Sequence, residues 1–204
     1  MPACPFYGEI MHIKRNILLN PGPATTTDSV KLAQVVPDIC PREQEFGALM
    51  RSVTEDLTAI AGGNEKYTTV LFGGSGTAAM DAVINSVAPP EKKILIINNG
   101  AYGERMVKIA QAYQIEYIDL QCPWDTLPDI KKITAALQQH PDIAVVSMVH
   151  HETTTGILNP IQKIGALVKQ YEKVFVVDTI SSFAGIPFDI RECQIDFMMS
   201  TSNK

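Results

Sequence analysis

The chain has 204 residues, 46% of them hydrophobic, and this length and composition favour one globular domain with a sizeable core. A formal net charge of −5 and a pI near 5.3 argue against a nucleic-acid-binding protein or a binder of anionic membranes. No apolar run approaches the roughly 18 residues that a membrane span requires. The first residues lack a basic stretch followed by an apolar one, so no secretory signal is expected.

The cysteines are scattered along the chain and form no C-x-x-C pair; they are Cys4, Cys40, Cys122 and Cys193. Such a distribution is typical of a reducing compartment. It therefore predicts free, buried thiols in a cytoplasmic protein.

Residues 1–45 are rich in proline and predict an irregular arm that lies across a neighbouring surface, with a turn at Asn20–Pro23. An amphipathic helix is expected next, because apolar residues recur at helical spacing from 46 to 60 and Gly62-Gly63 ends the run. The main domain is accordingly expected to span 46–204.

Strand-like and helix-like stretches alternate through the rest of the chain. The predicted strands are 67–72, 93–98, 115–120, 143–149, 173–178 and 195–200, and the predicted helices are 77–87, 103–112, 129–139 and 160–171. Continuous Val/Ile runs that alternate with helices indicate a parallel sheet covered on both faces. The expected fold class is α/β, with three α/β/α layers around a mostly parallel sheet.

Polar motifs follow the predicted strands. They are GGSGT (73–77), NNGAYG (98–103), HHETTTG (150–156), DTISS (178–182) and STSNK (200–204). In a parallel sheet of this kind, ligands bind beyond the carboxyl ends of the strands. We therefore expect these motifs to gather at one site.

The first motif opens a predicted helix and places Ser75 and Thr77 beside free backbone N–H groups, an arrangement that suits an anion. A dinucleotide fingerprint is nearly met by Gly74, Gly76 and Ala79, but the next strand ends without an acidic residue to hold a ribose. A nucleophile elbow would need glycine where Thr77 stands. Two interpretations of residues 73–77 therefore remain: a phosphate-binding cup, formed by Ser75, Gly76 and Thr77, and an ordinary tight turn.

Two further strand ends carry reactive groups. Asp178 ends the apolar run VFVVD, where a carboxylate is costly unless it is paired, for instance with a protonated ring nitrogen. A turn or helix-capping role is the alternative. Lys204 ends the next strand-like run. A lysine amine that is desolvated or close to other cations has a lowered pKa and can form Schiff bases with carbonyl compounds. An ordinary solvated lysine is the alternative.

Tyr102 stands between two small residues, where its ring could lie flat over a planar ligand or pack in the core. Thr153 is either a donor to a ring substituent or a loop residue. His150, His151 and Glu152 resemble metal ligands, but the H-E-x-x-H spacing is missing, so no metal site is expected.

Taken together, these features meet the needs of pyridoxal 5′-phosphate. The cup suits the phosphate and the aromatic ring suits the pyridine ring. The acid at position 178 suits the ring nitrogen, and the amine at position 204 suits the aldehyde.

The chain also resembles the class V aminotransferases of fold type I. The resemblance runs from ILLNPGPATTT (17–27) through FGGSGTAAMDAVI (72–84), NNGAYGERM (98–106), VHHETTTGILNPI (149–161) and VVDTISSFAG (176–185) to MSTSNK (199–204). Within that class, SGTAAM, HHETTTG and STSNK are most similar to the 2-aminoethylphosphonate–pyruvate transaminases. The resemblance thus covers nearly the whole chain.

This resemblance implies a role for each candidate residue. Ser75, Gly76 and Thr77 would hold the cofactor phosphate, Tyr102 would stack on the ring, Thr153 would bond the ring hydroxyl, Asp178 would pair with the pyridine nitrogen and Lys204 would bind the aldehyde covalently. The implied reaction moves an amino group from 2-aminoethylphosphonate to pyruvate, giving phosphonoacetaldehyde and alanine. The implied assembly is a homodimer, with the Asn20–Pro23 arm near a site close to the interface.

By the same resemblance, chains of the family continue beyond the lysine into a small C-terminal domain that this sequence lacks. That domain would supply an arginine for the acid group of the substrate. Two other functions stay open. One is an alanine–glyoxylate or serine–glyoxylate aminotransferase or a related lyase, and the other is a truncated, non-catalytic chain that dimerises or binds cofactor weakly.

Overall fold

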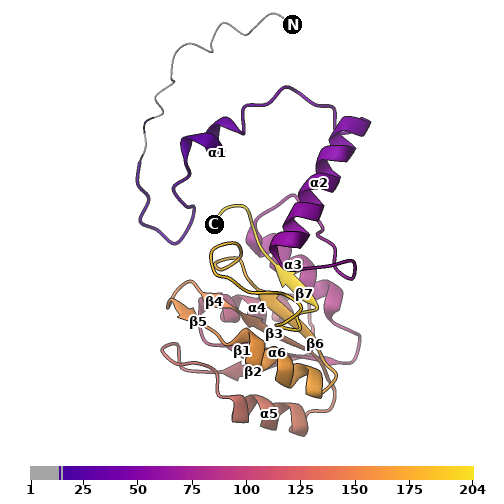
Figure 1. Ribbon diagram of the computed structural model, residues 1–204. Coiled ribbons are helices and arrows are strands. Elements are labelled where there is room, and N and C mark those ends of the chain that lie inside the picture. The colour runs from indigo at the N-terminus through magenta and orange to yellow at the C-terminus, as the bar shows by residue number, and fades with distance from the viewer. Residues whose placement is uncertain (1–13, 15) are drawn as a thin grey trace, which may run out of the picture.

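The computed structural model describes residue 14 and residues 16–204 (Figure 1). The helices are α1 (Asp28–Leu32), α2 (Gln44–Ile60), α3 (Gly76–Val87), α4 (Ala101–Ala112), α5 (Ile130–Gln139) and α6 (Ile161–Gln170). The strands are β1 (Lys93–Asn98), β2 (Tyr117–Gln121), β3 (Ile143–Val149), β4 (His151–Glu152), β5 (Ile157–Leu158), β6 (Val174–Asp178) and β7 (Phe197–Met199).

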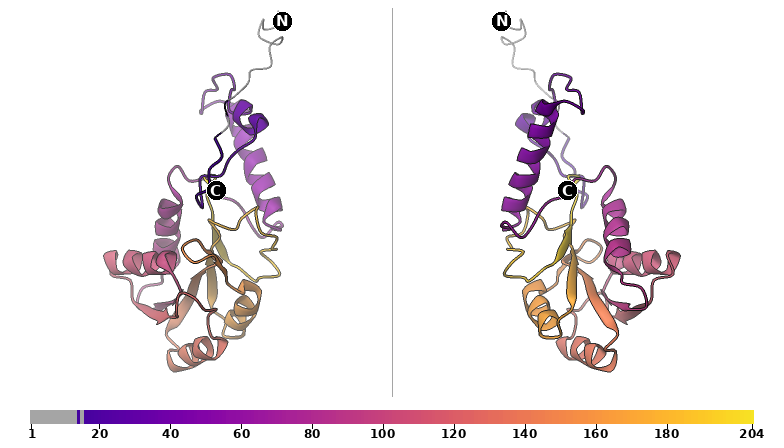
Figure 2. Two further views of the ribbon diagram at one scale, coloured as in Figure 1. Left: turned by 90° about the vertical axis from the view of Figure 1, so that its left-hand side faces the viewer. Right: turned by 90° about the vertical axis from the view of Figure 1, so that its right-hand side faces the viewer.

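Five of the strands form one sheet in the order β2-β1-β3-β6-β7, and every neighbouring pair is parallel. Helices α3 and α4 cover one face of the sheet, and α5 and α6 cover the other (Figure 2). The predicted α/β/α layers and parallel sheet are therefore confirmed. Strands β4 and β5 form a separate antiparallel hairpin in a stretch that was predicted to be a loop.

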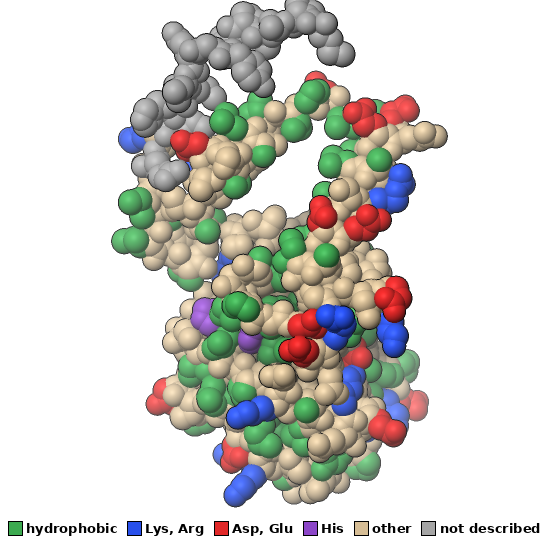
Figure 3. All heavy atoms as spheres, in the orientation of Figure 1, with side chains coloured by type: hydrophobic (Ala, Val, Ile, Leu, Met, Phe, Trp, Pro, Cys, Tyr) green, Lys and Arg blue, Asp and Glu red, His purple; other side chains and the backbone are tan. Residues whose placement is uncertain are grey.

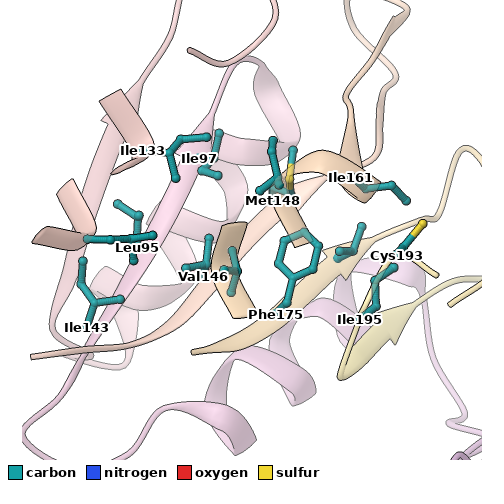
Figure 4. Close-up of a cluster of buried hydrophobic side chains, with 14 of the residues drawn as sticks. Leu95, Ile97, Ile133, Ile143, Val146, Met148, Ile161, Phe175, Cys193 and Ile195 are labelled. Atoms are coloured by element: carbon teal, nitrogen blue, oxygen red, sulfur yellow. The ribbon is translucent and has the colours of Figure 1, made fainter. Parts of the chain in front are cut away.

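Each face of the sheet has its own apolar core. On the α5–α6 face, Phe175 lies among aliphatic side chains such as Val146, Met148 and Ile195 (Figure 4). On the opposite face, Met80 and Met106 pack on the other side of the same strands. Full burial of one large apolar side chain stabilises the fold by about 1.5–3 kcal/mol, so these two cores hold the strand ends in place.

The stretch 67–72 differs from its prediction. It forms no strand in the described chain, and Val70 is 80% exposed. The edge strand β7 pairs only with β6 among the described residues. A segment rich in β-branched and aromatic residues forms a strand only where a neighbouring strand pairs with it. The prediction for 67–72 was wrong because no described strand pairs with this segment.

The N-terminal part differs from its prediction in two respects. Residues 1–13 and 15, which belong to the predicted arm, lie outside the described residues. The rest of the arm contains α1, a short helix that was not predicted. The predicted amphipathic helix is confirmed as α2, yet none of its residues is buried. Figure 3 shows open space between the α1–α2 segment and the body, with apolar side chains on that segment.

The cysteine prediction holds for two residues. Cys122 and Cys193 are free and buried, and burial raises the pKa of both thiols. Cys40 is free but exposed, since it lies in the uncovered segment before α2, and Cys4 falls outside the described residues. None of the helices formed by the described residues is both long and apolar enough to cross a membrane.

Candidate active site

The register of the sheet places three of the polar motifs, 150–156, 178–182 and 200–204, next to one another at the carboxyl ends of the strands. Val149 pairs with Asp178, and Asp178 pairs with Met199, so β3, β6 and β7 end side by side. The residues that follow these strands therefore leave the sheet together. This is the arrangement that the sequence predicted for a site at the carboxyl ends of parallel strands.

Asp178 lies between the carboxyl ends of β3 and β7, and its side chain is buried, with the residue 2% exposed. Burial raises the pKa of its carboxyl group to about 6, although the N–H group of Ile180, which donates to Oδ1 at 2.8 Å, opposes the rise. The charge of Glu152 adds to the increase, and the charges of Lys204 and Arg105 act against it. A buried carboxylate in this state is stabilised by any cationic group placed next to it.

Lys204 faces two hydroxyl groups. Its Nζ atom donates to Thr153 Oγ1 at 3.2 Å and to Ser181 Oγ at 3.1 Å, and the two hydroxyls also bond to each other. Gly22 packs directly on the lysine stem, since a Cβ atom at position 22 would lie 2.5 Å from Lys204 Cγ. The described part of the N-terminal arm thus contacts the Lys204 side chain.

Tyr102 lies near the start of α4 and contacts both cations of the site. The guanidinium carbon of Arg105 is 4.5 Å from the centroid of the Tyr102 ring, and Lys204 Nζ is 5.4 Å from it. The backbone N–H of Tyr102 donates to Glu152 Oε2 at 3.2 Å. The aromatic ring therefore lies between the cup and the lysine.

The candidate cup forms the start of α3. Ser75 is the N-cap, and its hydroxyl accepts a bond from the Ala78 N–H at 3.2 Å. Gly76 approaches the loop after Asp178 so closely that a Cβ atom there would lie 2.8 Å from Ile180 Cδ1. Thr77 Oγ1 accepts a bond from Arg105 at 2.9 Å. These contacts connect the cup to the loop after Asp178 and to the helix that carries Tyr102.

The residues that resembled metal ligands take part in internal hydrogen bonds. His150 is buried with its Nδ1 atom 2.9 Å from Ser182 Oγ, and burial, followed by the charge of His151, lowers its pKa to about 4. Glu152 is fully buried and accepts bonds from the N–H and hydroxyl groups of Thr154 as well as from Tyr102.

Three residues of the site were not among the candidates from sequence: Arg105, Glu152 as a partner of Tyr102, and Ser181. Ser181 lies inside the DTISS motif, and Arg105 lies one helical turn beyond Tyr102, so their positions gave a signal. Their contacts depend on how loops from different strands meet, which no local pattern reveals.

The arrangement fits pyridoxal phosphate on the evidence of its own donors and acceptors. The buried carboxylate of Asp178, whose pKa is raised, would be stabilised by a cationic ring nitrogen. The primary amine of Lys204 lies near the aromatic ring of Tyr102. Helix N–H groups and hydroxyls at the start of α3 suit a phosphate. Contacts link Thr77, Arg105, Tyr102, Lys204 and Thr153 in one series, Gly76 approaches the loop after Asp178, and Ser75 caps the same helix.

Comparison with known proteins agrees with this geometry. The family model described as aminotransferase class V matches residues 30–204. The 2-aminoethylphosphonate–pyruvate transaminases of Salmonella paratyphi C and Salmonella typhimurium are each 43% identical over 195 residues, which is 95% of this chain and 53% of theirs. The chain thus spans about half the length of the curated relatives it matches.

Solved structures show the same similarity. The alanine–glyoxylate aminotransferase from Nostoc sp. superposes with a TM-score of 0.86 at 30% identity, covering 96% of this chain and 52% of that one. The pyridoxamine–pyruvate aminotransferase from Mesorhizobium loti also has a TM-score of 0.86, at 26% identity, covering 95% and 49%. On the fold, the site and these similarities, the chain belongs to the class V aminotransferase family.

Proposed function

We propose that this chain carries the pyridoxal 5′-phosphate site of an aminotransferase that moves the amino group of 2-aminoethylphosphonate to pyruvate. One observation carries the proposal. Lys204 and the buried Asp178 interact electrostatically at the same edge of the sheet, beside the ring of Tyr102. An amine, a buried acid and an aromatic ring in one place are what this cofactor requires.

Each residue would have one task. The N–H groups and hydroxyls of Ser75, Gly76 and Thr77 would bind the phosphate. Tyr102 would orient the ring, and Thr153 would donate to the ring hydroxyl. Asp178 would hold a proton on the ring nitrogen. Its burial supports this role, because a buried carboxylate is stabilised by a neighbouring cation.

Lys204 would bind the aldehyde and then move the proton at Cα of the amino donor. Pyridoxal phosphate, when bound, draws electrons away from that carbon. Thr153 and Ser181, which accept hydrogen bonds from Nζ in the structure, would hold the amine near the site when it is released.

The choice of substrate rests on the similarity to the Salmonella transaminases, which covers 95% of this chain. A second candidate is transfer to or from glyoxylate, which the likeness to the Nostoc enzyme favours. We further propose that the protein acts in the cytoplasm as a homodimer, a state that the uncovered α2 helix supports.

Amino donors tested one at a time on the purified, cofactor-loaded chain separate these functions. The absorbance band expected at about 400–430 nm should decline with 2-aminoethylphosphonate and return on addition of pyruvate. A response to serine or alanine with glyoxylate, and none to the aminophosphonate, would favour the second candidate. A stable band that no donor changes would point to a chain that binds cofactor without turnover.

A further inference from the structure

The candidate phosphate cup has donors but no charge of its own. Ser75, Gly76 and Thr77 offer hydroxyl and N–H groups only. A phosphate monoester carries a charge of about −1.5 to −2 at pH 7. An arginine can bind a phosphate through two parallel charge-assisted N–H···O bonds, which add energy and fix the geometry of the pair. A cation beside the cup would therefore contribute strongly to binding.

Arg105 is the cation that reaches the cup. Its Nη1 atom donates to Thr77 Oγ1 at 2.9 Å, a bond that uses one of the five N–H donors of the guanidinium group. Within the described part of the chain it forms no ion pair with a carboxylate. Its charge and most of its donors are therefore available for an anion held at the start of α3.

The helix geometry explains why the arginine lies there. Tyr102 and Arg105 are three residues apart on α4, so their side chains share one face of the helix. The guanidinium stacks on the Tyr102 ring with 4.5 Å between its carbon and the ring centroid. A cation–π contact of this kind holds the guanidinium over the ring and uses none of its N–H donors.

We propose that Arg105 is a further binding residue of the site, which balances the charge of the cofactor phosphate from beside Thr77. The proposal rests on the proposed function, since it assigns the anion as the phosphate of pyridoxal phosphate. Helix α4 would then contribute two residues to the cofactor site: Tyr102 would contact the ring of the cofactor, and Arg105 would bind its phosphate.

The alternative is that Arg105 only supports Tyr102. Stacking alone would then matter, and loss of the arginine would weaken the binding of the pyridine ring whether or not a phosphate is attached. The two roles can be separated with a pair of ligands, pyridoxal 5′-phosphate and pyridoxal, which share ring and aldehyde and differ in the phosphate.

The test measures dissociation constants of both ligands for the purified chain, from the absorbance of the bound aldehyde. We expect Arg105→Met to weaken pyridoxal phosphate by about tenfold to a hundredfold and to leave pyridoxal within about twofold. Arg105→Lys, which keeps the charge, should recover part of the loss. Lys108→Met removes an exposed charge from the same helix and should change neither constant.

Three results would overturn the proposal. Equal losses for both ligands would assign Arg105 to the support of Tyr102 alone, and no loss for either ligand would remove it from the cup. A lysine variant as weak as the methionine variant would show that charge is not what the residue supplies. If the unaltered chain bound neither ligand, the proposed function itself would fail, and this inference with it. Circular dichroism of each variant establishes that it is folded.

Discussion

Asp178 and His150 are both buried beside the strand ends, and burial shifts their pKa values in opposite directions. The carboxyl group of Asp178 has its pKa raised from 3.8 to about 6, whereas the imidazole of His150 has its pKa lowered from 6.5 to about 4. Folding thus favours the neutral form of each residue. The two groups have opposite effects on how stability depends on pH.

Proton binding sets the sign of each effect. Between pH 3.8 and about 6 the folded state holds a proton on Asp178 that the unfolded state has lost, so this group lowers stability as pH rises. For His150 the unfolded state binds the extra proton between about pH 4 and 6.5, so its contribution rises with pH in nearly the same range. In the unaltered chain the two effects largely oppose each other.

Replacing Asp178→Asn should expose the histidine effect. We expect the free energy of unfolding of this variant, relative to the unaltered chain, to rise by about 2–3 kcal/mol between pH 4 and pH 7 in the absence of cofactor, because the destabilising carboxyl group is gone. Urea denaturation at a series of pH values measures it. Parallel profiles for the two proteins would show that the carboxyl group is not desolvated as described. His150→Asn, as a control, should produce the opposite trend.

Individual residues also show where sequence reasoning succeeds. The sequence predicts Asp178 as a site residue because a carboxylate ends an apolar strand, and Lys204 because an amine ends the polar stretch that follows the next strand. Ser181 and Arg105 were missed because their importance lies in contacts across the fold, with the lysine and the cup. Local pattern finds a residue that breaks the hydrophobic pattern, and it does not find one that only meets a partner in space.

At the scale of elements, α6 packs closely on the turn that precedes β7 and on Phe175 of β6, the strand that carries Asp178. Gly165 lies in the middle of α6, and a Cβ atom there would be 2.0 Å from the backbone oxygen of Cys193. The neighbouring atom belongs to the main chain, so it cannot move aside as a flexible side chain would. The helix can pack at this distance only because the residue is glycine.

Gly165→Ala is therefore expected to destabilise the chain by about 1–3 kcal/mol, the usual cost of overpacking. Gly47→Ala is the matched control on α2. A Cβ atom at position 47 would meet only Arg51 Nη1, at 3.7 Å, so the better helix propensity of alanine should stabilise by about 0.5–1 kcal/mol. Thermal or urea unfolding compares the two. A stability loss of equal size in both variants would contradict the packing described for α6.

Element prediction succeeded where the local pattern decides the outcome. The strand at 143–149 has the predicted bounds, and α3, α5 and α6 begin or end within a residue or so of theirs. The stretch 67–72 has the composition of a strand, yet it finds no partner in the described chain. Periodicity gives the conformation that a segment prefers, and the neighbours decide whether that conformation forms.

At the scale of the whole molecule, the chain divides into a well-packed body and a segment with little contact to it. The body has a core on each face of its sheet, whereas α1 and α2 contain no buried residue. Figure 3 shows the open space between this segment and the body. Exposed apolar side chains on α2 include Leu49 and Ile60, which are 48% and 56% exposed. A surface of this kind favours contact with another protein surface.

In the proposed homodimer, the exposed apolar side chains of α2 would contact the second copy of the chain. We expect light scattering to find a molar mass of about twice the 22.3 kDa of one chain. A charge in the apolar face, as in Leu49→Glu, should shift the protein toward the single-chain mass, and Glu55→Lys on the same helix should not. A single-chain mass for the unaltered protein at high concentration would count against the dimer.

The central claim is that Lys204 binds an aldehyde cofactor beside the buried acid at position 178. Peptide mass mapping after borohydride reduction of the chain with pyridoxal 5′-phosphate tests it directly. We expect a reduced cofactor adduct on the peptide ending at Lys204, and its loss in Lys204→Ala, while other lysines such as Lys108 stay unmodified at stoichiometric cofactor. An adduct spread over surface lysines, or one that persists in Lys204→Ala, would contradict the account.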